Sequence, residues 1–159
     1  MNSARRISSK QISVVKYYEA YELDRVVESA GRTITEADIV HFAGISGDHH
    51  ALHTDAEFAS GSLFGRRIAH GALVFSIATG LFIQMEGSNQ ALTAYYGIDR
   101  LRFVHPVFIG DTVRVRVRVV EKAVKDETRG LVTFEKIVLN QQEQTVIAYT
   151  DKMLFKRSP

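Results

Sequence analysis

A carboxylate and an imidazole lie five positions apart in the segment Asp48-His49-His50-Ala51-Leu52-His53. Such a pair is sufficient to activate a water molecule and to move a proton near neutral pH. The spacing leaves a plain alternative open, in which Asp48 caps a turn after Gly47 and His53 is an exposed loop residue. Asp48 and His53 are therefore candidate catalytic residues that need further context.

That context comes from Gly71, which follows His70 and begins a long apolar segment. A glycine lets a ligand approach the backbone closely, and the unpaired N–H groups in the first turn of a helix point at whatever lies in front of it. Together they form the outline of an oxyanion hole. The alternative is that Gly71 only permits tight packing where the helix begins.

The histidines of the same stretch could be mistaken for a metal site, because His49 and His53 are four positions apart. We expect no metal, since the segment from Asp48 to His53 is not predicted to be a continuous helix. We expect His70 to be a packed, hydrogen-bonded residue that takes no direct part in catalysis.

Helices predicted in the first half of the chain must position these residues. One opens at Thr35, where Asp38 completes a capping pair, and it fades across residues 44–48, so the histidine-rich segment begins in a loop. Residues 54–59 are typical of a short capped helix. Residues 71–85 are apolar on nearly every side, which predicts a helix buried all round. It is too short for the roughly twenty residues that span a bilayer.

The second half of the chain alternates with period two. Residues 112–119 place every Val on one face of a strand and every Arg on the other. Further strands are predicted at residues 91–104, 131–139 and 144–155. With one strand before the helices, the prediction is an α+β fold in which a curved antiparallel sheet wraps around one buried helix.

Composition limits the classes of function. The chain has 159 residues, 45% of them hydrophobic and 24% charged, which is typical of one globular domain. A net charge of +2 gives no support to nucleic-acid binding, and the absence of Cys excludes disulfides and thiolate metal sites. We expect a flexible basic tail at residues 1–12 rather than a targeting signal, a single domain at 13–159, no membrane attachment and a cytoplasmic location.

Three motifs in order resemble the MaoC-like dehydratases, the group that includes the (R)-specific enoyl-CoA hydratases. They are SGDHHALHTD (46–55), IAHGAL (68–73) and RFVHPVFIGD (102–111), and the resemblance covers about residues 33–155. It implies the hot-dog fold, a sheet wrapped around a long central helix, in agreement with the architecture predicted above. It also implies an enzyme that adds water to a 2-enoyl thioester or removes it, with no cofactor, because coenzyme A is part of the substrate.

The resemblance makes Asp48 and His53 the catalytic pair and gives Gly71 the N–H that binds the thioester oxygen. Thr79, expected to contact the substrate, stands where relatives often have a serine on the same helix. One departure matters, because many relatives read Asp-Phe-Asn-Pro-Leu-His where this chain has His49-His50-Ala51 after the aspartate. Without the Asn and the Pro the loop is less fixed, or its polar contacts come from His50.

Substrate contacts are expected from both charged and apolar residues. Arg66 and Arg67 flank the approach to Gly71 and are the candidates for the coenzyme A phosphates. The stripe Arg114, Arg116 and Arg118 is expected to be a solvated strand face. An apolar acyl tunnel would run along the helix, with its depth set in part by Phe75. The resemblance further implies at least a homodimer with its sites close to the subunit boundary.

Two rival functions stay open on the sequence. A hot-dog thioesterase would act on the same thioester but usually places its carboxylate on the buried helix, and residues 71–84 contain no acid. A non-catalytic subunit that binds acyl thioesters is the other rival, because the loop between Asp48 and His53 is altered.

Overall fold

A computed structural model of the chain describes residues 15–87 and 89–159, so the tail expected at residues 1–12 lies outside the described part. The helices are α1 (Glu36–Ser46), α2 (Ala51–Thr54), α3 (Ala56–Ser60) and α4 (Gly71–Glu86), with a 3-10 turn η1 (Tyr18–Ala20). The strands are β1 (Val26–Glu28), β2 (Arg32–Thr33), β3 (Leu92–Phe103), β4 (Thr112–Val124), β5 (Arg129–Leu139) and β6 (Thr145–Lys156).

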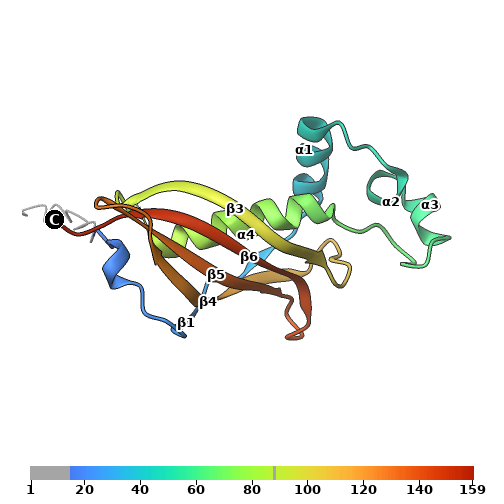
Figure 1. Cartoon of the computed structure of the whole chain (residues 1–159). Coiled ribbons are helices and arrows are strands. Elements are labelled where there is room, and N and C mark those ends of the chain that lie inside the picture. Colours follow the sequence, from blue (N-terminus) through green and yellow to red (C-terminus); the bar gives the residue numbers. More distant parts are fainter. Residues whose placement is uncertain (1–14, 88) are drawn as a thin grey trace, which may run out of the picture.

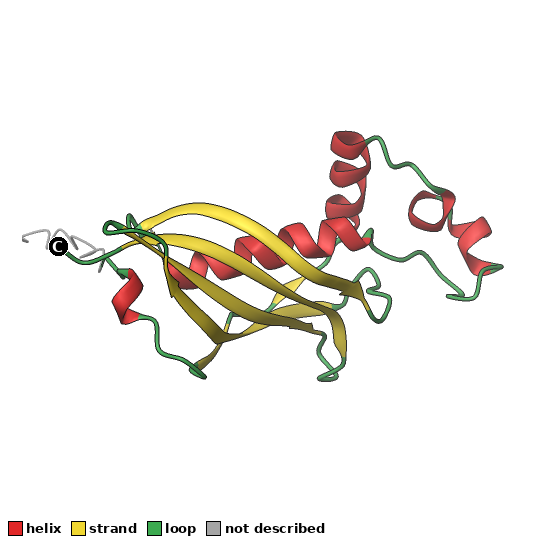
Figure 2. Cartoon of the chain, viewed as in Figure 1, coloured by secondary structure: helices red, strands yellow, loops and turns green. Residues whose placement is uncertain are grey.

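The six strands form one antiparallel sheet that curves along α4, so the predicted α+β architecture is confirmed (Figures 1 and 2). The strand order is β1-β4-β5-β6-β3, and β2 pairs with β4 as well. α1, α2 and α3 project from one end of this body, beyond the N-terminal end of α4 (Figure 1). The segment that carries Asp48 and His53 is therefore an excursion from the sheet-and-helix body.

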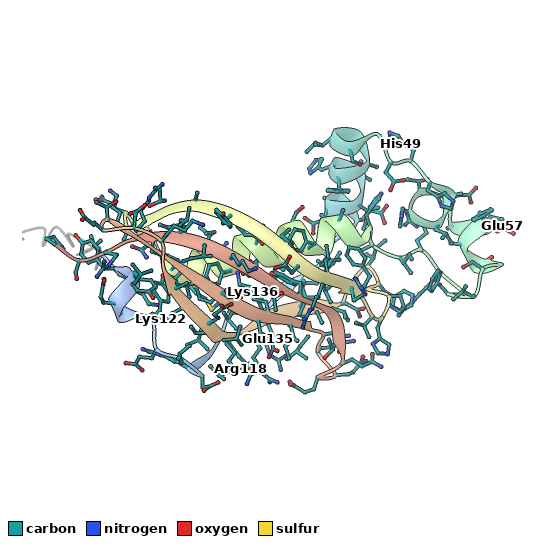
Figure 3. The ribbon with its side chains drawn as sticks, viewed as in Figure 1. His49, Glu57, Arg118, Lys122, Glu135 and Lys136 are labelled. Atoms are coloured by element: carbon teal, nitrogen blue, oxygen red, sulfur yellow. The ribbon has the colours of Figure 1, made fainter. Side chains whose placement is uncertain are left out.

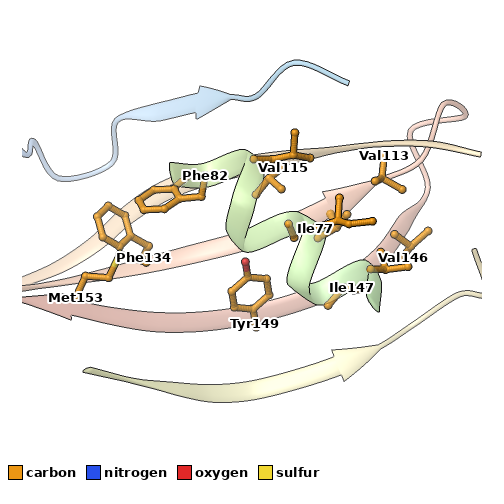
Figure 4. Close-up of a cluster of buried hydrophobic side chains, with 14 of the residues drawn as sticks. Ile77, Phe82, Val113, Val115, Phe134, Val146, Ile147, Tyr149 and Met153 are labelled. Carbon is orange, nitrogen blue, oxygen red and sulfur yellow. The ribbon is translucent and has the colours of Figure 1, made fainter. Parts of the chain in front are cut away.

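The period-two pattern of β4 divides its two faces as predicted. Val113, Val115 and Val117 are at most 2% exposed and pack in the core with side chains of α4 such as Ile77 and Phe82 (Figure 4). Burying a side chain of this size stabilises the fold by about 1.5–3 kcal/mol. The sheet is thus held against α4 mainly by apolar contact.

The arginines of β4 lie on the outer face and are paired with acids. Arg114 and Arg116 both contact Glu28 of β1 and Glu143 of the β5–β6 turn, and Arg118 contacts Glu135 of β5 at 2.9 Å. This network of exposed ion pairs confirms the expectation that the arginines form a solvated outer face of the strand.

The expectation that α4 is buried all round is wrong for the single chain. Its core face is closed, but one side is exposed and consists of Ala72, Ser76, Gly80, Ile83 and Gln84. Small and apolar residues on this side hid the exposed face from a hydropathy pattern. Within the described residues, no helix combines the length and the apolar character needed to cross a membrane.

The caps before the site are resolved in detail. The Thr35 hydroxyl accepts from the Asp38 N–H, and the Asp38 carboxylate accepts from the Thr35 N–H, which confirms the capping pair. α1 does not fade at Gly44 but continues to Ser46, and Gly47 ends it in the left-handed region at φ 76°. Asp55, not Thr54, caps the next helix, and a separate turn of helix, α2, contains His53.

A buried ion pair crosses the core face of β5 and β6. Lys136 and Asp151 are both 0% exposed, with 2.7 Å between Nζ and Oδ2, and the Tyr95 hydroxyl donates to the same Oδ2 at 2.6 Å. The Lys136 ammonium also lies 3.4 Å from the centre of the Phe82 ring of α4. Burial lowers the pKa of Lys136 to about 8, although Asp151 acts in the opposite direction.

We expect Lys136→Met to lower the free energy of unfolding by about 3–5 kcal/mol, because it leaves a buried carboxylate without its cation. The double variant Lys136→Met, Asp151→Leu should be much less destabilised, since it removes both charges. Chemical denaturation measures both free energies. The control is Arg129→Gln, which breaks an exposed ion pair with Asp126 and should change the free energy of unfolding little. A single variant as stable as the double variant would contradict this account.

Candidate active site

The excursion between α1 and α4 is closed by hydrogen bonds to the peptide groups of Ile68. The Ile68 N–H donates to the Leu52 carbonyl at 3.2 Å, and the Ile68 carbonyl accepts from Nδ1 of His53 at 2.8 Å. The next residue, Ala69, donates its N–H to Val107 at 2.7 Å and so joins the returning chain to the body. Residues 52 and 53 are thereby brought to the N-terminal end of α4.

The bond to Ile68 fixes which nitrogen of His53 is basic. A carbonyl oxygen only accepts, so Nδ1 carries the hydrogen and Nε2 carries the lone pair. A carboxylate oxygen of Asp48 lies within 4.8 Å of a ring nitrogen of His53 and of one of His70. This limit is shorter than the full span of two hydrogen bonds of about 2.8 Å each through one bridging atom.

Local contacts prepare Asp48 and His53 for different tasks. Oδ1 of Asp48 accepts from the His50 N–H at 3.2 Å, and this bond is the main reason that the pKa of Asp48 lies below its usual range. Burial lowers the pKa of His53, and the bond to Ile68 only partly offsets it. At neutral pH the site therefore presents a carboxylate and a neutral imidazole.

His50 supplies a contact that the sequence left open. Its Nδ1 accepts from the Leu52 N–H at 3.2 Å and so caps α2. Asn is among the side chains that usually do this at a helix start. The polar contacts of the loop thus come in part from His50, as one of the two alternatives from the sequence had it.

His70 is buried between the excursion and α1. It is 2% exposed, its Nε2 donates to the Asp48 carbonyl at 2.9 Å, and its ring centre lies 3.8 Å from that of His53. Phe42 of α1 packs against the ring at 5.0 Å. The expectation of a packed, hydrogen-bonded His70 is confirmed.

Gly71 is the first residue of α4, as expected, and begins it with unpaired N–H groups. His70 is the N-cap but makes no side-chain cap, so the first-turn N–H groups point out of the helix end. A Cβ at position 71 would lie 2.8 Å from ring carbons of Phe103, which is closer than side chains pack. A Cβ here would displace the Phe103 ring, so glycine lets this β3 side chain lie directly against the backbone.

An apolar cavity of about 410 Å³ opens beside Gly71. Its walls include Phe64 and Ile68 from the excursion, Phe103 from β3 and Val146 from the start of β6. Neither Asp48 nor His53 lines it, but Ile68 both lines it and holds His53. The cavity is large enough for a small acyl group next to a helix N-terminus.

The predicted substrate contacts are not all gathered at this site. Arg66 and Arg67 line a separate hollow of about 290 Å³. The guanidinium of Arg66 lies 4.0 Å from the centre of the Phe108 ring. The guanidinium of Arg67 donates to both carboxylate oxygens of Glu36. Thr79 donates to the Ser76 carbonyl within α4, and Phe75 packs edge-on against Tyr149. Phe75 lies about one turn of α4 beyond Gly71, and Thr79 about two turns.

Sequence reasoning missed Ile68 and Phe103. The contribution of Ile68 is a backbone peptide, for which the side-chain sequence carries no signal. Phe103 could have been suspected from its place in the third motif, because a large ring that packs against the backbone explains why position 71 is a glycine. Figure 3 also places His49 on the exposed segment between α1 and α2, apart from the cluster of Asp48, His53 and His70.

Comparisons with known proteins identify related sequences. A sequence profile described as MaoC like domain matches residues 19–142. Protein MaoC of Klebsiella aerogenes is 42% identical over 112 residues, which are 70% of this chain and 33% of that protein. The 3-hydroxybutyryl-CoA dehydratase of Methylorubrum extorquens is 35% identical over 108 residues, which are 67% of this chain and 66% of that protein. Other relatives are named (R)-specific enoyl-CoA hydratase.

Solved structures agree as well. A protein described as a monoamine oxidase regulatory protein from Archaeoglobus fulgidus superposes with a TM-score of 0.86 and 41% identity, over 90% of this chain and 95% of that one. A Mycobacterium tuberculosis protein described as having a double hotdog fold gives a TM-score of 0.79 at 20% identity, over 90% of this chain and 44% of that one. The hot-dog fold is thus confirmed. The chain spans a third of the length of Protein MaoC and about two thirds of that of the dehydratase.

We expect an NMR titration to give His53 a pKa below the ordinary value of about 6.5, because burial disfavours its charged form. In Asp48→Asn the pKa should fall further, since the carboxylate that stabilises the imidazolium is lost. His49→Gln, in the same segment, should leave the titration unchanged. A His53 pKa above 6.5, or one that rises in Asp48→Asn, would be inconsistent with this electrostatic assignment.

Proposed function

Because the chain belongs to the MaoC-like dehydratase family, we propose that it is an enzyme that adds water to, or removes it from, the C2=C3 bond of a 2-enoyl thioester. The observation that carries the proposal is the approach of Asp48 and His53 to within 4.8 Å beside the N-terminus of α4. The names of the hydratase and dehydratase relatives support the same reaction.

In the proposed reaction Asp48 and His53 hold one water molecule between them. The carboxylate and Nε2 of His53 are both acceptors at neutral pH, so a proton passes from the water to one of these two groups as the water oxygen bonds to C3 of the substrate. The electron pair of the double bond moves toward the thioester oxygen, where the Gly71 N–H stabilises the enolate. A proton returned from the pair to C2 completes the 3-hydroxyacyl thioester, and dehydration is the reverse. No electron is gained or lost overall, and the scheme uses no cofactor.

The proposed substrate is an acyl-CoA thioester. The apolar cavity beside Gly71 would take part of the substrate next to the thioester, and exposed Arg66 is the better candidate for a coenzyme A phosphate. Arg67 is a weaker candidate than the sequence suggested, because Glu36 already occupies its guanidinium. Thr79 and Phe75 would meet only a chain long enough to follow α4.

The two rival functions differ in their support. For a thioesterase, the helix offers only Glu86, at its far end, where it accepts from the hydroxyl of Tyr21 and from Lys16. A non-catalytic role finds support in the word regulatory in the description of the Archaeoglobus protein. The intact pair of Asp48 and His53 favours the hydratase over both.

We expect Asp48→Asn and His53→Ala each to lower kcat with crotonyl-CoA by at least about 10²-fold, since each removes a group that handles the proton. Loss of the enoyl absorbance measures the reaction. His49→Ala, an exposed histidine of the same segment, is the matched control and should retain activity.

The same assay separates the rival functions. Release of free coenzyme A from crotonyl-CoA would favour the thioesterase. No reaction across several chain lengths, together with measurable binding of the acyl-CoA, would favour the binding subunit. Near-full activity in both Asp48→Asn and His53→Ala would refute the assignment of the pair.

We also propose that the chain forms a homodimer through β3. This strand is at the end of the sheet order and, among residues 15–87 and 89–159, pairs only with β6, so in this part of the chain its outer edge carries unpaired backbone groups. Tyr95, Tyr96 and Ile98 on it are 40–52% exposed, and the exposed side of α4 is rich in small and apolar residues. An apolar edge of this kind is a template for pairing with a second copy.

Sedimentation equilibrium should therefore give a mass of about twice that of one chain. Ile98→Lys should shift the protein toward monomer, because a charge on the edge opposes pairing. Val124→Lys, an equal change at the end of β4, should leave the mass unchanged. A wild-type protein that stays monomeric at micromolar concentration would contradict the dimer.

A further inference from the structure

We propose that His70 is a positioning residue that fixes Asp48 and His53 relative to each other; the inference rests on the proposed hydratase function. His70 itself is not assigned any contact with substrate. It acts through two contacts with the pair, one by its Nε2 and one by the face of its ring.

The first contact ties the Asp48 loop to the body of the protein. Nε2 of His70 donates to the Asp48 carbonyl at 2.9 Å across 22 positions of sequence. The N–H of Asp48 donates to Ser46, and its carboxylate accepts from His50, so these other hydrogen bonds stay within the loop. Asp48 is exposed, and burial does not hold it in place. The bond from His70 therefore sets the peptide from which the carboxylate projects.

The second contact sets the plane of the His53 imidazole. The two rings are 3.8 Å apart between centres and inclined by 30°, so they are nearly stacked. Phe42 of α1 packs against the His70 ring and keeps that ring in place. Among the described residues the imidazole of His53 makes one hydrogen bond, from Nδ1 to Ile68, and this bond alone leaves the ring free to rotate about it. Stacking removes that freedom and directs Nε2.

An imidazole is the small side chain that offers both contacts. A phenyl ring could stack but not donate, and a glutamine could donate but not stack. Nδ1 of His70 is buried without a hydrogen-bond partner among residues 15–87 and 89–159. The hydrogen bond from Nε2 is therefore the polar contact that explains a histidine at this buried position. Gly71 follows directly, so one residue links the acid, the base and the proposed oxyanion donor.

The test uses two variants that each keep one contact. His70→Phe keeps a ring against His53 and loses the donor, and His70→Gln keeps a donor near the Nε2 position and loses the ring. kcat and KM with crotonyl-CoA, the pH profile of kcat/KM and the thermal midpoint are measured for each. His41→Gln, an exposed histidine of α1, is the matched control.

A positioning role predicts that kcat falls by about 10- to 100-fold in His70→Phe, because small displacements of reacting groups are costly, with KM nearly unchanged. His70→Gln should recover part of that loss. Asp48, His50 and His70 are the charged or titratable groups that act on His53. Burial is the main cause that lowers the pKa of His53, so loss of the covering ring in His70→Gln should raise that pKa and move the acid limb of kcat/KM to higher pH.

Other results overturn the inference. They are unchanged kcat in both variants, or losses that follow the thermal midpoint while the acid limb stays in place. If the wild-type protein does not hydrate crotonyl-CoA at all, the proposed function fails instead. The inference is then decided by NMR: the His53 pKa must rise in His70→Gln, which uncovers the imidazole, and an unmoved His53 resonance and pKa would refute it.

Discussion

The backbone of Ile68 is the link on which the site depends. Its N–H and its carbonyl bind Leu52 and His53, and the next residue pairs with Val107 of the body. The excursion would otherwise be a long connection between α1 and α4 with mostly exposed side chains. The two hydrogen bonds of the Ile68 backbone hold this connection in one conformation, and the connection in turn positions an acid and a base.

The burial of α4 determines where the N-terminus of this helix lies relative to Asp48 and His53. The sheet packs against the core face of α4, so its N-terminus must emerge at one end of the body, where the excursion projects (Figure 1). No side chain caps the first turn, and such unpaired N–H groups attract negative charge. Packing thus brings the N–H groups proposed as the oxyanion donor to the same end of the body as the excursion that carries the carboxylate and the neutral imidazole.

Local patterns were sufficient to predict much of this from sequence. The capping pair of Thr35 and Asp38, the alternation in β4 and the start of α4 at Gly71 each depend on neighbours in the chain. Contacts between distant segments were not predictable. Nothing in the sequence indicates that Lys136 is buried beside Asp151, or that the carbonyl of Ile68 selects the tautomer of His53. Resemblance supplied the roles of Asp48 and His53, and the fold supplied their geometry.

β3 connects the proposed pairing of subunits with the proposed chemistry. Its central residues form the unpaired edge, and its last residue, Phe103, covers Gly71 and lines the apolar cavity. Phe103 is 55% exposed in the single chain, so its ring is held on one side only. In a dimer joined along β3, the strand that carries this ring would gain a neighbour. The shape of the cavity would then depend on assembly, which gives a physical reason for the active site to lie close to a subunit boundary.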